Sequence, residues 1–231
     1  MHKKFLVITA NLGKKDKLVD PPKAYPNCDY IAITDTGTPT NIWKLSKPFI
    51  FSEIDKYTHR RNAKIYKVLS TLLFSQYEYI IWQDGNHQLK VDPSLILDEY
   101  GGFDLLLFNH PHRQCAYDEM GVIYGLNLDE HPNIKNQYTH YTEQGFPKNY
   151  GLYEMTTFIK RNTPENVSLD LMWWEQICKF SSRDQCSFTY CLWKMENKLN
   201  IKTFKGHANL YAGGNKYFSE QEGHLSNADH T

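Results

Sequence analysis

Short runs of apolar residues recur along the first half of the chain, and each run ends in polar residues. Residues 5–9, 30–34, 79–82 and 103–108 have the length and the branched or aromatic content of strands. Residues 79–82 are apolar on both faces, which is typical of a central parallel strand covered on both sides. The pattern therefore predicts a sheet built from these runs.

Between these runs the apolar residues follow helical spacing. Asp92 and Pro93 have the capping pattern of a helix start, and Gly101 ends that helix. Residues 58–74 carry one apolar face, made of Ile65, Val68, Leu69, Leu72 and Leu73. Because strands and helices alternate, we expect an α/β fold with a mainly parallel central sheet, flanked by helices and joined by right-handed crossovers.

The helix at 58–74 is also the main local source of positive charge. On a helical wheel Arg60, Lys64 and Lys67 share the stripe opposite the apolar face, while Arg61 lies nearest the sheet. Arg60 and Lys67 are expected to face solvent. Arg61 and Lys64 either do the same or neutralise a phosphate group near the strand ends.

The second half of the chain has weaker patterns. Residues 109–150 are irregular apart from a helix expected at 132–144. We expect strands at 155–159 and 201–204, with a helix at 182–195 between them. A further helix begins at 164, with an apolar face of Val167, Leu171, Trp174 and Ile177. Residues 1–218 are expected to form one domain and residues 219–231 a loose polar tail.

Composition removes several classes of function. The chain has 26 Lys plus Arg and 26 Asp plus Glu, so its overall charge gives no reason to expect a nucleic acid or an anionic membrane as partner. No stretch reaches the roughly 20 apolar residues of a transmembrane helix, and the start does not resemble a signal peptide. The five cysteines form no metal-binding pair and are expected to be buried, reduced thiols. We therefore expect a cytoplasmic protein.

The strand at 79–82 ends in the most informative polar cluster of the chain. Asp84, Gly85, Asn86 and His87 follow it directly. In open α/β sheets, ligands bind at the carboxyl ends of the strands. A carboxylate beside an amide and an imidazole suits a divalent metal ion. The alternative is a common Asp-Gly turn without a function.

Three polar residues of the second half are further candidates. Asp184 and Gln185 lie in the first turn of the expected helix at 182–195, where they either cap the helix or point into the cleft towards ligand hydroxyls. Glu154 precedes a strand, so it either faces the cleft or is an exposed acid.

Histidines offer two possible additions to a metal site. His207 follows the expected last strand and is either an ordinary surface or core residue or the ligand that completes a site begun by Asp84. His110 and His112 form an HxH pair, which is a weaker alternative because the loop supplies no third ligand.

Three motifs in a fixed order indicate a family. They are residues 61–67 (Arg-Asn-Ala-Lys-Ile-Tyr-Lys), 79–86 (Tyr-Ile-Ile-Trp-Gln-Asp-Gly-Asn) and 181–188 (Ser-Ser-Arg-Asp-Gln-Cys-Ser-Phe). With them the chain resembles the glycosyltransferase-like family that includes plant proteins of seed-mucilage and pollen-development pathways and, more loosely, the GT-A nucleotide-sugar transferases. The resemblance covers about residues 3–210 and implies a single-domain, Rossmann-like GT-A fold.

The resemblance also implies roles for individual residues. The turn from Asp84 to Asn86 stands where other members carry an Asp-x-Asp motif that holds Mn²⁺ or Mg²⁺, with Asn86 as a neutral replacement and His207 as the late ligand. Asp184 and Gln185 would contact the donor sugar. The nucleoside would be held by Thr9, Ala10, Asn11 and Asp35. The diphosphate would lie near Arg61 and Lys64.

These expectations converge on a metal-dependent glycosyltransferase. It would move a sugar from a UDP- or GDP-sugar to a glycan or another hydroxyl acceptor, with cations stabilising the leaving diphosphate. An inverting reaction also needs a carboxylate base, for which Asp184 and Glu154 are the candidates. The sequence leaves retention and inversion open. It also leaves two alternatives open. The first is a non-catalytic binding module, which Asn86 suggests, and the second is a metal-dependent phosphoesterase.

Overall fold

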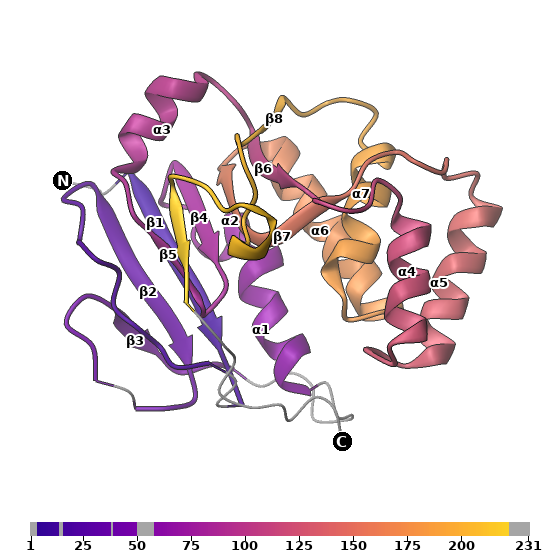
Figure 1. The fold of residues 1–231 in the computed structure, drawn as a ribbon, viewed down its shortest axis with the longest axis horizontal. Helices are drawn as coiled ribbons and strands as arrows, with labels where there is room; N and C mark the ends of the chain where they lie inside the picture. The colour runs from indigo at the N-terminus through magenta and orange to yellow at the C-terminus, as the bar shows by residue number, and fades with distance from the viewer. Residues whose placement is uncertain (1–3, 14–15, 38, 50–57, 222–231) are drawn as a thin grey trace.

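A seven-stranded sheet forms the centre of the molecule in the computed structural model, which describes residues 4–13, 16–37, 39–49 and 58–221 (Figure 1). The strand order is β3-β2-β1-β4-β7-β6-β8. In chain order the strands are β1 (Phe5–Asn11), β2 (Cys28–Thr34), β3 (Lys44–Ser46), β4 (Tyr79–Gln83), β6 (Leu105–Asn109), β7 (Tyr153–Arg161) and β8 (Ile201–Thr203).

Six strands of this sheet run in one direction, and β7 runs against them. β1 pairs in parallel with β2 and β4, and β2 with β3, whereas β7 is antiparallel to both β4 and β6. β8 is parallel to β6. The amino end of β7 therefore lies at the edge where the other strands have their carboxyl ends. The expected α/β fold with a mainly parallel sheet is confirmed, and the reversed strand is an addition to it.

Helices cover both faces of the sheet. They are α1 (Thr58–Val68), α2 (Ser70–Leu73), α3 (Pro93–Tyr100), α4 (Ala116–Gly125), α5 (His131–Glu143), α6 (Pro164–Lys179) and α7 (Asp184–Lys194). In Figure 1 α4 to α7 form a group beside β6 and β7, and α3 lies apart from them. The single helix expected at 58–74 is instead two helices, and Leu72 and Leu73 on the second are exposed.

Alternate residues of the strands enter two hydrophobic clusters, one on each face. On β4, Ile80 and Trp82 join the cluster under α1 and α4 to α7, while Tyr79 and Ile81 join the cluster under α3. This period of two is what a strand requires. Burial on both faces explains why the strand is apolar throughout.

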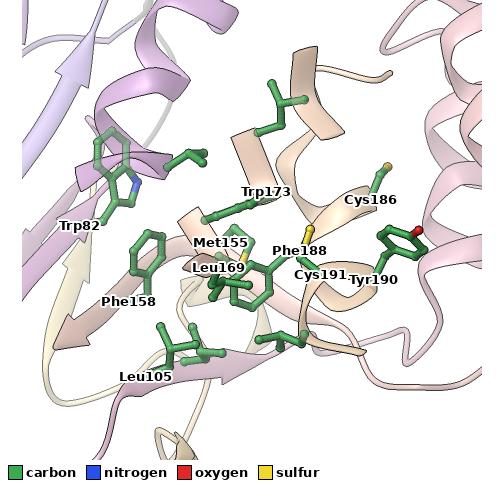
Figure 2. Close-up of a cluster of buried hydrophobic side chains, with 14 of the residues drawn as sticks. Trp82, Leu105, Met155, Phe158, Leu169, Trp173, Cys186, Phe188, Tyr190 and Cys191 are labelled. Carbon is green, nitrogen blue, oxygen red and sulfur yellow. The ribbon is translucent and has the colours of Figure 1, made fainter. Parts of the chain in front are cut away.

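Several aromatic rings of the larger cluster meet where α6 and α7 pack on β7 (Figure 2). The ring of Trp173 from α6 lies edge-on to Phe188 from α7, with 4.7 Å between their centroids, and Phe158 of β7 completes the group. Trp173 also donates its indole N–H to the carbonyl oxygen of Asp184 at 3.1 Å. This packing fixes the first turn of α7 relative to the sheet.

A buried ion pair ties the sheet to two helices. The ammonium of Lys160 on β7 lies 2.6 Å from the Asp170 carboxylate of α6 and donates to the carbonyl oxygen of Val68 at 3.0 Å. Asp170 also accepts the hydroxyl proton of Thr71 at 2.6 Å. Lys160 and Asp170 are both fully buried. The pair therefore holds the end of α1 against α6.

A second, two-stranded sheet lies beside the main one. β5 (His87–Leu89) pairs antiparallel with β9 (Phe218–Glu220), and Figure 1 shows the two strands side by side. The loose tail was expected to begin at residue 219, but Ser219 and Glu220 belong to this strand pair. The rest of the expected tail, from residue 222, lies outside the described residues.

Three sequence-based expectations of packing are wrong. On α6 the buried residues include Leu169, Asp170 and Trp173, whereas Leu171, expected on the apolar face, is 52% exposed. The region expected to be irregular contains α4. Cys178 is exposed, although the other four cysteines are buried and all five are free thiols. No helix in the described ranges is long and apolar enough to cross a membrane.

Candidate active site

A cavity of about 580 Å³ opens at the carboxyl edge of the parallel strands. Its wall comes from the ends of β1 and β4, the start of β7, the polar side of α1 and the first turn of α7. Residues from η1 (Leu210–Ala212) and β9 close it on another side. Its charged lining side chains are Asp16, Arg60, Lys64, Lys67, Asp84, Arg183, Asp184 and Glu220.

The basic stripe of α1 faces this cavity. Arg60, Lys64 and Lys67 are spaced so that they share one side of the helix, and all three line the cavity. The expectation that Lys67 faces solvent is wrong, because only 1% of its side chain is exposed. The stripe that looks solvated on a helical wheel instead faces Asp184 at the start of α7 and Asp84 just after β4.

Two carboxylates hold the lysines in place. The Asp184 carboxylate lies 2.6 Å from the ammonium groups of both Lys64 and Lys67. Lys67 also lies 3.5 Å from Asp84, and the indole N–H of Trp82 donates to Asp84 at 2.7 Å. Two lysines and two aspartates thus form one ion-paired group that lines the cavity, in which Lys67 and Asp184 are buried and Asp84 is partly exposed.

Burial and ion pairing compete in setting the pKa values of this group. For Lys64, burial outweighs the attraction of Asp184 and lowers its pKa to about 7. For Lys67, burial acts in the same direction, but Asp184 and Asp84 outweigh it and the pKa is raised. For Asp184, burial acts to raise the pKa, but the two lysines overcome it and the pKa is lowered. Asp184 is therefore ionised and a weak base.

The turn after β4 brings further polar groups to the cavity. A Cβ on Gly85 would lie 2.9 Å from the Asp16 carboxylate, so a larger residue here would have to displace the Asp16 side chain. The side-chain oxygen of Asn86 accepts a hydrogen bond from Nδ1 of His87 at 2.8 Å. His87 is only 1% exposed, and burial lowers its pKa, so the ring is neutral near pH 7.

These residues do not fit a divalent ion as they are arranged. In the described ranges no group of three or more His, Cys, Asp or Glu side chains lies close enough to hold a metal ion. The ammonium of Lys67 lies between Asp84 and Asp184, and His207 does not line the cavity. The expected Mn²⁺ or Mg²⁺ stays a prediction.

Eight of the candidate residues from the sequence line the cavity together. They come from four separate segments, and they are Ala10, Asn11, Lys64, Asp84, Asn86, His87, Asp184 and Gln185. Within this group the Asn11 side chain holds the neighbouring loop, donating to the Asp16 carbonyl oxygen and accepting from the Asp16 N–H. The amide of Gln185 donates to the carbonyl oxygen of Tyr153 at 3.1 Å.

Three candidates near β1, β2 and α1 do not line the cavity. Thr9 is buried in β1, with 1% of its surface exposed. Asp35 accepts the backbone N–H of Gly13 at 2.9 Å and so braces the loop after β1. Arg61, expected near the diphosphate, turns towards α6 and donates to the carbonyl oxygen of Ile177 at 2.8 Å. In this arrangement Arg60 reaches the cavity and Arg61 does not.

Glu154 and His207 lie together behind the cavity wall. Glu154 is 2% exposed and accepts the N–H of Ala208 at 2.8 Å and the side-chain amide of Asn209. Burial raises the pKa of Glu154. The side chains of His110 and His112 lie in the loop after β6, where the Arg113 guanidinium contacts the His110 ring at 3.2 Å. None of Glu154, His207, His110 and His112 lines the cavity itself.

Sequence reasoning missed the contribution of the C-terminal segment. Asn209, Tyr211 and Glu220 line the cavity. The only signal for them was their position after the last expected strand, at the same edge of the sheet. Arg183, to which the sequence pattern gave no role, also lines the cavity.

A mainly parallel sheet with a charged cavity at its carboxyl edge has the arrangement in which α/β domains bind their ligands. The chain belongs to the TOD1/MUCI70 glycosyltransferase-like domain family, whose model matches residues 32–210. The family expected from the three motifs is thereby confirmed.

Known proteins agree with this assignment. The chain is 25% identical to the probable hexosyltransferase MUCI70 of Arabidopsis thaliana in an alignment of 156 residues that covers 61% of this chain and 26% of that protein. It thus spans about a quarter of that relative's length.

Solved structures with a similar fold include the WbbM bifunctional glycosyltransferase without ligand. The TM-score is 0.50 at 8% identity, over 88% of this chain and 39% of that chain. Mouse xyloside xylosyltransferase 1, also in its apo form, has a TM-score of 0.48 at 10% identity, over 87% and 84% of the two chains. At such identities the likeness to WbbM concerns the fold alone.

Proposed function

We propose that the cavity binds a UDP- or GDP-sugar and that the chain transfers the sugar to a hydroxyl acceptor. The observation that carries this proposal is the stripe of Arg60, Lys64 and Lys67 along one wall of the cavity. Cations that are partly desolvated and already fixed by ion pairs are suited to a diphosphate, whose charge is concentrated on a few oxygen atoms.

The reaction needs charge stabilisation at the leaving group. The bond between the anomeric carbon and the diphosphate oxygen breaks, and its electron pair stays on the diphosphate. The acceptor oxygen forms the new bond to the anomeric carbon, and its proton passes to the leaving diphosphate or to solvent. Lys64 and Lys67 would stabilise the charge that develops on the leaving oxygen, because their positions do not have to change during the reaction.

Asp184 has a positioning role in this proposal. Its carboxylate accepts from both lysines and its pKa is lowered, so it is poorly suited to remove the acceptor's proton. Glu154 has a raised pKa but does not line the cavity in the described structure. We therefore assign Asp184 to holding the lysines at the diphosphate.

Titration calorimetry with UDP and with GDP tests the proposal, once with Mn²⁺ and once with EDTA. We expect one nucleotide to bind and the Lys67→Met variant to bind it about tenfold or more weakly, since a charge-assisted contact is lost. Lys179→Met is the control, because Lys179 is an exposed lysine of α6. Comparison of the two buffers measures the contribution of a metal ion. Absence of binding to either nucleotide in both buffers contradicts the proposal.

Product analysis separates transfer from the two alternatives. The nucleotide that binds is supplied as its glucose, galactose and xylose donors, with and without a panel of glycan acceptors. Transfer predicts acceptor-dependent release of the nucleoside diphosphate. Binding without turnover indicates a non-catalytic module. Release of a nucleoside monophosphate with a sugar phosphate, or of inorganic phosphate, without an acceptor indicates a phosphoesterase.

A further inference from the structure

Tyr211 displays its ring at the rim of the cavity. It lines the cavity and is 71% exposed, the largest exposed fraction among the large hydrophobic side chains of the described residues. A single exposed ring needs no explanation by itself. Two further features distinguish Tyr211: its backbone is held in place by hydrogen bonds, and the ring of His112 lies beside its own ring.

The backbone around Tyr211 is fixed by two carboxylates from different strands. Glu154 of β7 accepts the N–H of Ala208, and Glu220 of β9 accepts the N–H of Leu210 at 2.5 Å. The N–H of Gly213 donates to Leu210 at 2.9 Å and closes the single turn of η1. A ring on such a turn loses little conformational freedom when a ligand covers it.

A glycine closes the same segment at its start. Gly206 has a φ of +85°, and a Cβ on it would lie 2.5 Å from the carbonyl oxygen of Gly214. The N–H of His207 donates to that same oxygen at 2.9 Å. The segment 206–214 is therefore a closed loop, with Tyr211 at the cavity.

A second ring extends the aromatic surface. His112, from the loop after β6, lies with its ring centroid 6.0 Å from that of Tyr211 and its plane inclined by 25°. The loop is held by Nδ1 of His110, which accepts the N–H groups of His112 and Arg113. Burial, together with Arg113, lowers the pKa of His110 to about 4, so the ring is neutral near pH 7, and the two N–H groups that donate to Nδ1 make that nitrogen its acceptor.

We propose that Tyr211 and His112 form a subsite that binds one sugar ring of the acceptor. The C–H face of a pyranose is apolar and flat enough to cover an aromatic ring, while its hydroxyls remain available to polar neighbours such as Asn209. The cations of the cavity come from α1 and the start of α7, whereas the rings come from η1 and the loop after β6. An uncharged ligand suits the aromatic part. This inference rests on the proposed function, in which the sugar donor binds in the same cavity.

The nucleoside base of the donor is the competing occupant, because a base also stacks on a tyrosine. The two occupants make opposite predictions for the Tyr211→Ala variant. Loss of an acceptor contact weakens glycoside binding and leaves nucleotide binding unchanged. Loss of a base contact weakens nucleotide binding.

The test uses saturation-transfer-difference NMR on the full chain with the methyl glycosides of glucose, galactose, xylose and rhamnose, with and without UDP or GDP. We expect ring C–H protons of at least one glycoside to receive saturation. Tyr211→Ala should weaken that binding about tenfold, as expected for a lost stacking contact, and Tyr211→Phe should preserve it. Tyr138→Ala, which removes an exposed ring of α5, is the control.

Three results would overturn the inference. They are no glycoside binding to the wild-type chain, unchanged binding to Tyr211→Ala, and a tenfold loss of nucleotide affinity in that variant with glycoside binding intact. His112→Ala, expected to weaken glycoside binding about threefold, repeats the test on the second ring. Glycoside binding that depends on Tyr211, in a chain that binds neither UDP nor GDP, would support the subsite and reject the transferase.

Discussion

Lys67 carries a charge that is almost completely buried, with only 1% of its side chain exposed. Burial of an unpaired ammonium is very costly, and Asp184 and Asp84 offset that cost. The same pairing gives Asp184 a low pKa and a fixed position. One carboxylate therefore determines where two cations of the cavity lie.

Asp184→Asn tests whether this residue positions the lysines or acts as a base. We expect affinity for UDP or GDP and the rate of transfer to fall together, each about tenfold, because the lysines lose their shared partner. Calorimetry and a nucleotide-release assay measure the two quantities. Asp98→Asn on α3 is the control. A large loss of rate with unchanged affinity would instead identify a catalytic base.

Lys64 makes donor binding depend on pH. Its pKa is lowered to about 7, mainly by burial, so the ammonium is present below pH 7 and is lost as the pH rises through that value. Binding of a nucleotide-sugar, whose diphosphate does not titrate in this range, should weaken by about tenfold or less between pH 6 and pH 8. Calorimetry at both values measures the change. Lys64→Met should bind equally at the two pH values; a variant that keeps the wild-type slope contradicts this assignment.

The sequence located some site residues and misplaced others for identifiable reasons. Asp84 and Asp184 could be found because one ends a buried strand and the other begins a helix, and both positions lie at the ligand-binding edge. Lys67 could not, because a polar stripe on a helix looks the same whether it faces water or a polar cavity. Arg61 was assigned to the sheet side, where it contacts carbonyl oxygens of α6 instead of a ligand.

At the scale of elements, three short strands and the direction of one long strand were not predicted. β3, β5 and β9 have three residues each, too few to show a period of two, whereas β8, which is equally short, was expected at 201–204 and is found at Ile201–Thr203. The direction of β7 follows from how α4 and α5 return the chain to the sheet, which no local pattern records. The long strands and α3, with their clear periodicity and caps, were found close to their observed positions.

The loop 206–214 gives a prediction at this scale. Gly206→Ala places a methyl group against Gly214 and forces a positive φ on alanine, so it should destabilise the protein by about 1–3 kcal/mol. Chemical denaturation measures this loss, and glycoside binding through Tyr211 should weaken with it. Gly102→Ala is the matched control, because nothing lies within 4 Å of its added Cβ. Equal stability of the two variants would show that the loop is not closed in this way.

At the scale of the molecule, the Lys160 and Asp170 pair links the sheet to the helices that frame the cavity. Lys160 also donates to the carbonyl oxygen of Lys67 at 3.4 Å, so the pair supports the backbone of the residue whose ammonium lines the site. The charge of Lys160 has no exposed surface over which to be hydrated.

Asp170→Asn should therefore destabilise the whole fold. A buried ion pair that loses one partner leaves the other charge uncompensated, at a cost of about 3–5 kcal/mol. Urea denaturation followed by tryptophan fluorescence measures the shift in midpoint, since Trp173 lies in the adjoining cluster. Asp118→Asn, at an exposed position in the first turn of α4, should change the midpoint little. A shift no larger than that of Asp118→Asn would show that the pair contributes little.

The outermost strands of the main sheet, β3 and β8, are three residues long, and each carries a lysine, Lys44 or Lys202. Edge strands this short present few unpaired backbone N–H and C=O groups to a neighbouring molecule. A charged side chain on each edge strand further disfavours pairing with another strand. Even at high concentration, the sheet described here is therefore a poor template for strand-by-strand growth into fibrils.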